Sequence, residues 1–144
     1  MSGLSKLGMK QILSIVLIVS LIFSCKKNDE ELCDTYLTIG STNTPIATTL
    51  SQGITSTINS HGPDLCYKFS SMEITQQPTP SGPVYQFHYF IKVKVTVECG
   101  SQICAQAIYN STNSIFLTPI VKGTYYLHFY NQNQLFKTDT VIVN

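Results

Sequence analysis

The sequence contains no arginine and no tryptophan, and charged residues make up only 12% of its 144 residues. Nine lysines nearly balance eight acidic residues, so the formal net charge is +1. Proteins that bind nucleic acids usually present a face on which arginine and lysine cluster. The balance also leaves little electric field to steer a charged ligand. The composition therefore argues against a nucleic-acid partner.

Motifs that carry catalytic or metal chemistry are also missing. The sequence has no G-x-S-x-G segment, no H-E-x-x-H pair and no glycine-rich phosphate loop. His61, His88 and His128 lie far apart without the spacing of metal ligands, and no pattern brings Glu73 and Glu98 together. We predict no catalytic residue, no metal and no cofactor. A cleft that groups two or more of these five side chains within hydrogen-bond reach would contradict this prediction.

Only one long hydrophobic run is present, at residues 12–23, and it follows Lys6 and Lys10. A helix that spans a membrane needs roughly 20 apolar residues, whereas this run has about 12. A basic start, a short apolar run and the small residue Ser24 are typical of a secretory signal peptide. We therefore expect residues 1–24 to be a cleaved N-terminal signal helix.

The end of the run, Ile22-Phe23-Ser24-Cys25, resembles the lipobox of bacterial lipoproteins, in which a cysteine follows a small residue. The resemblance implies cleavage between Ser24 and Cys25, attachment of diacylglycerol to the Cys25 thiol, and acylation of the new amino terminus. Phe23 departs from the small residue usual at its position. Two or three acyl chains anchor a protein stably to a membrane.

The densest run of charges follows at once, Lys26-Lys27-Asn28-Asp29-Glu30-Glu31. Such a run cannot pack, and it predicts a solvated tether over residues 25–32. It also resembles the export signal of surface lipoproteins of the Bacteroidota type, although Asn28 interrupts the pattern. The resemblance implies display on the outer face of the outer membrane; the alternative is an anchor that faces the periplasm. Residues 33–144 then form one domain.

Four cysteines follow the tether: Cys33, Cys66, Cys99 and Cys104. An even number in an exported domain predicts two disulfides, with three possible connectivities. We favour Cys99–Cys104, which closes a short turn, together with Cys33–Cys66. A zinc site needs thiolates at close paired spacing such as C-x2-C, and these cysteines do not have it. Disulfides are therefore the preferred interpretation.

The clearest structural signal is the alternation over residues 84–98. Apolar residues occupy every odd position from Tyr85 to Val97, and most even positions are polar. Side chains alternate across a pleated sheet, so this period of two predicts one long strand with a buried face.

Weaker patterns predict the remaining elements. Further strands are expected at residues 35–39, 66–75, 105–109 and 115–117, and one or two within 46–58, where Gly53 is a break. Connections are expected at the proline-rich residues 76–83 and at the loop 110–114. A hairpin is expected from residues 123–130 and 135–143 around a four-residue loop. About seven or eight strands, and no convincing helix after residue 24, predict an all-β fold, a single antiparallel β-sandwich.

Pro119, Gly123 and Tyr125, with the alternating apolar residues that follow, resemble the penultimate strand of immunoglobulin-like and fibronectin-like domains. In such domains a tyrosine near the start of this strand ties down a corner by bonding to the backbone upstream. The resemblance covers the last quarter of the chain and implies an immunoglobulin-like (Ig-like) sandwich.

One set of side chains is a candidate binding face: Tyr126, His128, Tyr130 and Phe90, at strand positions opposite the core-facing ones. If exposed, they form a polar-aromatic platform for sugars or peptides; the alternative is that a second sheet or the proline-rich loop covers them. We interpret the protein as a non-catalytic, lipid-anchored binding module whose ligand is a glycan, a peptide or an envelope partner. The alternative is a structural or accessory subunit that pairs a sheet edge with another protein. A long edge strand without lysine or proline would favour that alternative.

Overall fold

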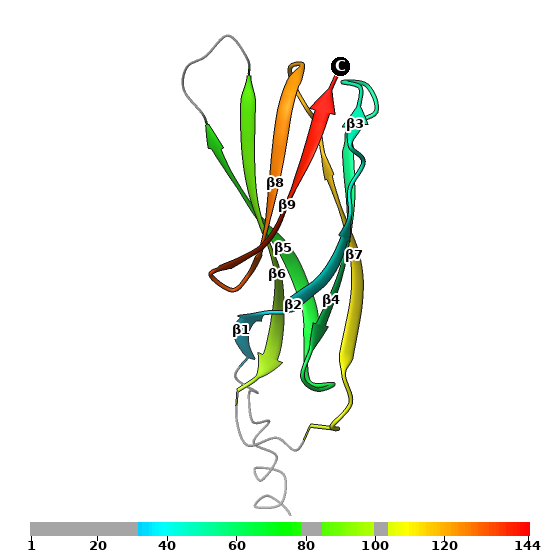
Figure 1. The fold of residues 1–144 in the computed structure, drawn as a ribbon. Helices are drawn as coiled ribbons and strands as arrows, with labels where there is room; N and C mark the ends of the chain where they lie inside the picture. The colour runs from blue at the N-terminus through cyan, green and yellow to red at the C-terminus, as the bar shows by residue number, and fades with distance from the viewer. Residues whose placement is uncertain (1–31, 79–84, 100–103) are drawn as a thin grey trace, which may run out of the picture. The chain divides into compact units, whose positions relative to one another are not determined.

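The computed structural model describes residues 32–78, 85–99 and 104–144. These residues form nine strands and no helix (Figure 1). The strands are β1 (Leu32–Tyr36), β2 (Thr38–Asn43), β3 (Ala47–Thr48), β4 (Ile54–Gly62), β5 (Lys68–Pro78), β6 (Gln86–Glu98), β7 (Tyr109–Leu117), β8 (Gly123–Asn131) and β9 (Gln134–Val143). Within the three stretches, no helix is long and apolar enough to cross a membrane. The predicted signal helix, Cys25 and the charged run lie outside the described residues.

The strands form two sheets that enclose one hydrophobic core (Figure 1). Sheet B contains β2, β4 and β7 in that order. Sheet A has β6 at its centre, with β5 along one side of it. On the other side, β8 pairs with the first half of β6 and β1 with its end, and β9 and β3 continue the sheet beyond β8. The predicted all-β sandwich is confirmed at this level.

The prediction that all strands are antiparallel is wrong at two pairings. β6 and β8 run parallel, as do β3 and β9. Two parallel neighbours need a long crossover connection rather than a tight turn. β7 supplies it, because the chain leaves β6, runs through sheet B, and returns to sheet A in the direction of β6. This departure follows from sheet membership, which local sequence patterns do not encode.

The long strand predicted at residues 84–98 is confirmed as β6. Its alternate residues Ile91, Val93 and Val95 are fully buried. The core is filled from both sheets by Leu37, Ile39, Ile54, Ile58, Ile91, Val93, Val95, Ile115, Leu117, Tyr125, Leu127, Phe129, Val141 and Val143. Burying one such side chain contributes about 1.5–3 kcal/mol, so alternating burial fixes the register of every strand that contributes to the core.

The predicted tyrosine corner is present at the start of β8. Tyr125 is 1% exposed, and its hydroxyl donates a hydrogen bond of 2.8 Å to the backbone oxygen of Val121. The hairpin of β8 and β9 is also confirmed, with a tighter turn than predicted. The strands extend to Asn131 and Gln134, and Gln132 adopts a left-handed conformation with φ of 57°.

The boundaries near the amino terminus differ from the prediction. The strand expected at residues 35–39 is divided between β1 and β2, which belong to different sheets. Gly53, with φ of 71°, separates β3 from β4 as expected. β5 continues to Pro78 instead of ending before the proline-rich connection. A proline is tolerated there because β5 is an edge strand that ends at this residue.

The prediction for residues 105–114 is wrong. The strand expected at 105–109 is absent, and the expected loop at 110–114 is the first half of β7. The polar residues of this segment lie in the sheet because their side chains bond across to β4. Thr112 Oγ1 donates to Asn59 Oδ1 at 2.7 Å, and the hydroxyls of Ser114 and Thr57 are 3.2 Å apart.

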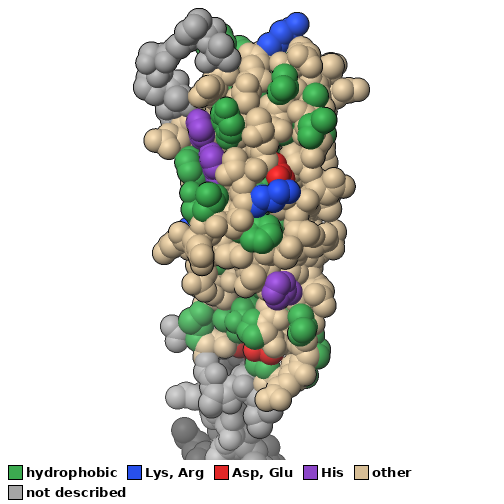
Figure 2. Space-filling view, in the orientation of Figure 1, with side chains coloured by type: hydrophobic (Ala, Val, Ile, Leu, Met, Phe, Trp, Pro, Cys, Tyr) green, Lys and Arg blue, Asp and Glu red, His purple; other side chains and the backbone are tan. Residues whose placement is uncertain are grey.

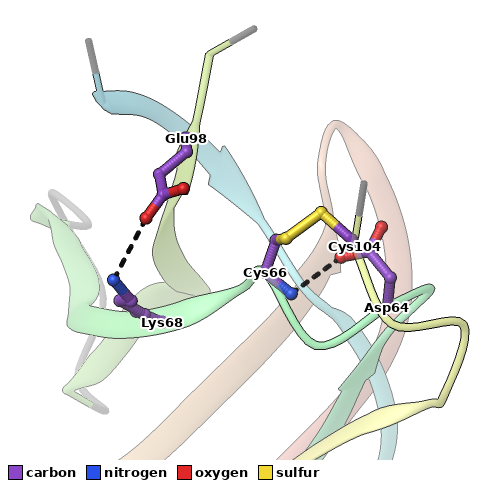
Figure 3. The surroundings of a disulfide bond; sticks show 5 residues. All are labelled: Asp64, Cys66, Lys68, Glu98 and Cys104. Atoms are coloured by element: carbon purple, nitrogen blue, oxygen red, sulfur yellow. Dashed lines mark hydrogen bonds and ion pairs between the residues drawn. A yellow bond between two sulfur atoms is a disulfide. The ribbon is translucent and has the colours of Figure 1, made fainter. Parts of the chain in front are cut away.

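Two disulfides form, as predicted, but the favoured pairing is wrong. Cys33 is bonded to Cys99, and Cys66 is bonded to Cys104. The antiparallel pairing of β1 with β6 places Cys33 opposite Val97, next to the position of Cys99. The other disulfide joins the chain before β5 to the chain before β7 (Figure 3).

Candidate functional site

The outer face of sheet A carries all four residues of the predicted binding face. On β6 and β8, one set of alternate side chains enters the core and the other set points away from it. Phe90, Tyr126, His128 and Tyr130 belong to the second set, and each is half-buried. The parallel register brings them side by side, because Phe90 lies opposite His128.

Five rings form a continuous row along this face, here called the aromatic row: Tyr126, His88, His128, Phe90 and Tyr130. The successive centroid distances are 4.8, 5.2, 5.1 and 6.0 Å. The first three contacts are stacked, with interplanar angles of 22° or less, and the last is tilted at 39°. Figure 2 shows histidine side chains next to hydrophobic side chains at the surface.

His88 is the member of the row that sequence reasoning missed. His88 is an even-numbered residue of the alternating segment 84–98 and points away from the core, but its ring partners come from β8. Its Nδ1 lies 2.9 Å from Nε2 of His128, and Nδ1 of His128 lies 2.9 Å from the Thr138 hydroxyl. Burial lowers the pKa of His128 below its ordinary value, and the neighbouring His88 lowers it further. The lowered pKa favours the neutral form of His128 in the folded protein.

A hollow of about 270 Å3 adjoins the Tyr130 end of the row. It is lined by Glu73, Thr75, Phe90, Lys92, Tyr130 and Asn133. His88 and His128 lie within hydrogen-bond reach of each other, but neither of them lines this hollow. Glu73 lines the hollow. Glu98 lies elsewhere, where it pairs with Lys68 at 3.4 Å near the Cys66–Cys104 disulfide (Figure 3). His61 lies on β4 in sheet B and is exposed.

Hydrogen bonds fix the polar groups of the hollow. The Tyr36 hydroxyl donates to Glu73 Oε2 at 2.7 Å, and Lys92 Nζ donates to Asn133 Oδ1 at 3.2 Å. The Lys92 ammonium also lies 5.0 Å from the centre of the Tyr36 ring, a cation–π distance. The hydrogen bond to the Glu73 carboxylate is the main cause that raises the pKa of Tyr36 above its ordinary value. Tyr36 therefore remains a donor that orients Glu73.

The two lysines of this face differ in their partners. Lys94 forms an ion pair with Asp34 at 2.7 Å, and this hydrogen bond is the main cause that raises the pKa of Lys94. Among the residues that the structure describes, Lys92 forms no ion pair. The hollow therefore offers one carboxylate and one ammonium that is not neutralised by a direct partner.

A possible metal cluster at Asp64, Cys66 and Cys104 does not provide a site. Their potential ligand atoms lie within 4.8 Å of one another, but both sulfur atoms belong to the disulfide drawn in Figure 3. Metal binding by cysteine requires the thiolate. Asp64 Oδ1 instead accepts a hydrogen bond of 2.9 Å from the backbone nitrogen of Cys66.

Comparison with known proteins adds no family assignment. No family model, no curated protein and no solved structure matches the chain.

Proposed function

We propose that the protein is a non-catalytic binding module anchored to the cell envelope through a lipid on Cys25, and that the outer face of sheet A holds its ligand. The observation that carries the proposal is the hollow at the end of the aromatic row. It combines two aromatic rings with a carboxylate, an ammonium, a hydroxyl and an amide. A ligand site of this type is mostly apolar in its walls and uses a few placed polar groups for orientation.

The geometry supports a sugar ring as the ligand. Inside the aromatic row, the ring faces are turned toward one another, so they are not free for a ligand. Tyr130 ends the row and lines the hollow, where a ring can pack against it. Glu73, Lys92 and Asn133 then offer acceptors and donors for hydroxyl groups. The volume of about 270 Å3 suits one sugar residue of a glycan rather than a large ligand.

The proposed location rests on the amino-terminal pattern and on the disulfides. Disulfides persist in oxidising compartments outside the cytoplasm, and two are present here. We favour display on the outer face of the outer membrane over an anchor that faces the periplasm. Protease treatment of intact cells separates the two: loss of the domain supports surface display, and full protection supports the periplasmic face.

The finer assignment to an Ig-like sandwich is also a proposal. The hydrogen bond from Tyr125 to Val121 supports it. The parallel pairing of β6 with β8 departs from the antiparallel C-F-G sheet of that fold.

The binding proposal is tested with the full chain in detergent micelles. Glycan arrays identify a ligand, and calorimetry measures its Kd. We expect Tyr130→Ala to raise the Kd about tenfold or more, because one ring contact at a ligand contributes about 1.4 kcal/mol. The matched control is Phe116→Ala, which removes a ring that is 62% exposed on the outer face of sheet B. An equal loss in both variants, or no glycan binding at millimolar concentration, overturns the proposal.

A further inference from the structure

The edge strands β5 and β7 differ in how they are protected. β5 carries Lys68 and Glu73, its register with β6 shifts between Phe69 and Ser71, and it ends at Pro78. Charges, bulges and proline are the usual devices that keep an edge strand from pairing with another chain. The β5 edge of sheet A, here called the guarded edge, is therefore protected against pairing with another chain.

β7 has none of these devices. Its nine residues include no charged residue and no proline. Its register with β4 is continuous from Tyr109, opposite Gly62, to Leu117, opposite Ile54. Among the described residues, β7 pairs with β4 alone, so alternate backbone groups on its other side have no strand partner. A long, regular and uncharged edge is a template for strand addition.

We propose that β7 pairs antiparallel with β7 of a second copy of the protein, about a two-fold axis at Asn113. Charges of one sign that face each other across the axis would repel, and β7 carries no charged residue. A two-fold interface is also self-complementary by construction. With Asn113 at the axis, Thr112 of one copy lies opposite Ser114 of the other, and Asn110 lies opposite Phe116.

The side chains of sheet B support this register. On the outer face, Asn59 Nδ2 donates to Ser41 at 3.0 Å, and Thr112 donates to Asn59 at 2.7 Å. This row of hydrogen bonds crosses sheet B and reaches β7. In the dimer it continues across the axis, from the Thr112 hydroxyl to that of Ser114 in the second copy. Hydroxyl pairs of this kind stabilise neighbouring strands.

The first test is cross-linking of the full chain at the proposed axis. Directly opposed residues of antiparallel strands have Cα atoms about 4.5–5.5 Å apart, which suits a disulfide. We expect Asn113→Cys to form a disulfide-linked dimer under mild oxidation, visible on a non-reducing gel. The matched control is Thr75→Cys, at an exposed position of the guarded edge β5, and it should remain monomeric. Equal cross-linking of both variants, or none at Asn113→Cys, overturns the proposal.

The second test uses charge, and it does not depend on an added thiol. Thr112→Lys with Ser114→Lys places lysines opposite one another across the axis, on the exposed outer face. We expect sedimentation velocity of the full chain in detergent to show a dimer for the unmodified protein and a monomer for this variant. Thr55→Lys, exposed on the central strand β4, should leave the dimer intact. A monomer for the unmodified protein at all concentrations, or pairing of β7 only with a different protein, contradicts a second copy as the partner.

Discussion

The two outer faces of the sandwich are built from the same alternation of side chains, yet they expose different chemistry. The face of sheet A carries the aromatic row, a hydrogen-bonded histidine pair and the hollow with Glu73 and Lys92. The face of sheet B carries neutral Ser, Thr and Asn side chains that bond to one another across the strands. We therefore propose a ligand site on the face of sheet A and pairing with a second copy at the edge of sheet B.

Strand order, and not strand composition, creates the candidate site. β6 and β8 become neighbours only because β7 lies in the other sheet. Their parallel register brings His88 next to both Tyr126 and His128. A sheet with β7 between them would separate the two rings on β6 from the three rings on β8. The following changes test how far the two sheets depend on each other, beginning with the largest expected effect.

The disulfides are expected to contribute most. Cys66–Cys104 connects segments that lead into different sheets, and its sequence separation is 38 residues. Closing a loop of this length restricts the unfolded chain by about 4 kcal/mol. Cys66→Ala with Cys104→Ala should therefore lower the free energy of unfolding by about that amount, as measured by urea denaturation.

The disulfide within sheet A is the matched comparison. Cys33–Cys99 has a sequence separation of 66 residues, so its removal should also cost about 4 kcal/mol. A clearly larger loss for Cys66–Cys104 would show that packing between the sheets depends on it. A urea midpoint unchanged in either double variant would contradict the expected role of that disulfide.

The next effect concerns the carboxylate that links the sheets. Asp139 of β9 accepts hydrogen bonds from Thr42 of β2 at 2.8 Å and from Thr44 at 2.7 Å, and it pairs with Lys137 at 2.7 Å. Its side chain is 11% exposed. Asp139→Asn removes the charge from these bonds and should cost about 2 kcal/mol at pH 7.

The stability cost of Asp139→Asn should also depend on pH. Burial alone would raise the pKa of Asp139, but the hydrogen bonds from Lys137, Thr44 and Thr42 outweigh it and lower the pKa below 3.8. Its stabilisation is present above the unfolded pKa of 3.8 and is lost as the pH falls through the lower folded value. The cost of Asp139→Asn should therefore shrink at pH 3 or below. Asp34→Asn, at a carboxylate that is 57% exposed, should cost at most about 0.5 kcal/mol.

The features that the sequence predicts correctly depend on residues that lie close together along the chain. The period of two in β6, the hairpin of β8 and β9, and the hydrogen bond of Tyr125 each involve a short segment. The four aromatic residues were assigned to outward positions by the same alternation. Local periodicity is sufficient for these features because the pleat fixes the direction of each side chain.

The features that were missed depend on which strands become neighbours. His88 and His128 are 40 residues apart, and their contact needs the parallel register of two strands. The disulfide pairing follows in the same way from the position of β1 beside β6. The prediction of a loop over the first half of β7 is wrong for a different reason, whereas the strand predicted at residues 115–117 is the end of β7. Asn, Ser and Thr are typical of loops, and the hydrogen bonds that hold them in sheet B come from β4.

The smallest expected effect is a loss of stability in acid, which should depend on His128 of sheet A and not on His61 of sheet B. Burial, and then the neighbouring His88, lower the pKa of His128 below 6.5 in the folded protein. The unfolded chain therefore binds more protons between the lower folded pKa and 6.5, so stability should fall as the pH is lowered through this window. Denaturation by urea between pH 7.5 and 5 should show this loss in the unmodified protein. His128→Phe, which keeps a ring beside Phe90, should reduce it. His61→Gln on sheet B leaves the histidine pair intact and should retain the full loss, so equal acid profiles for the two variants would show that the aromatic row does not respond to pH.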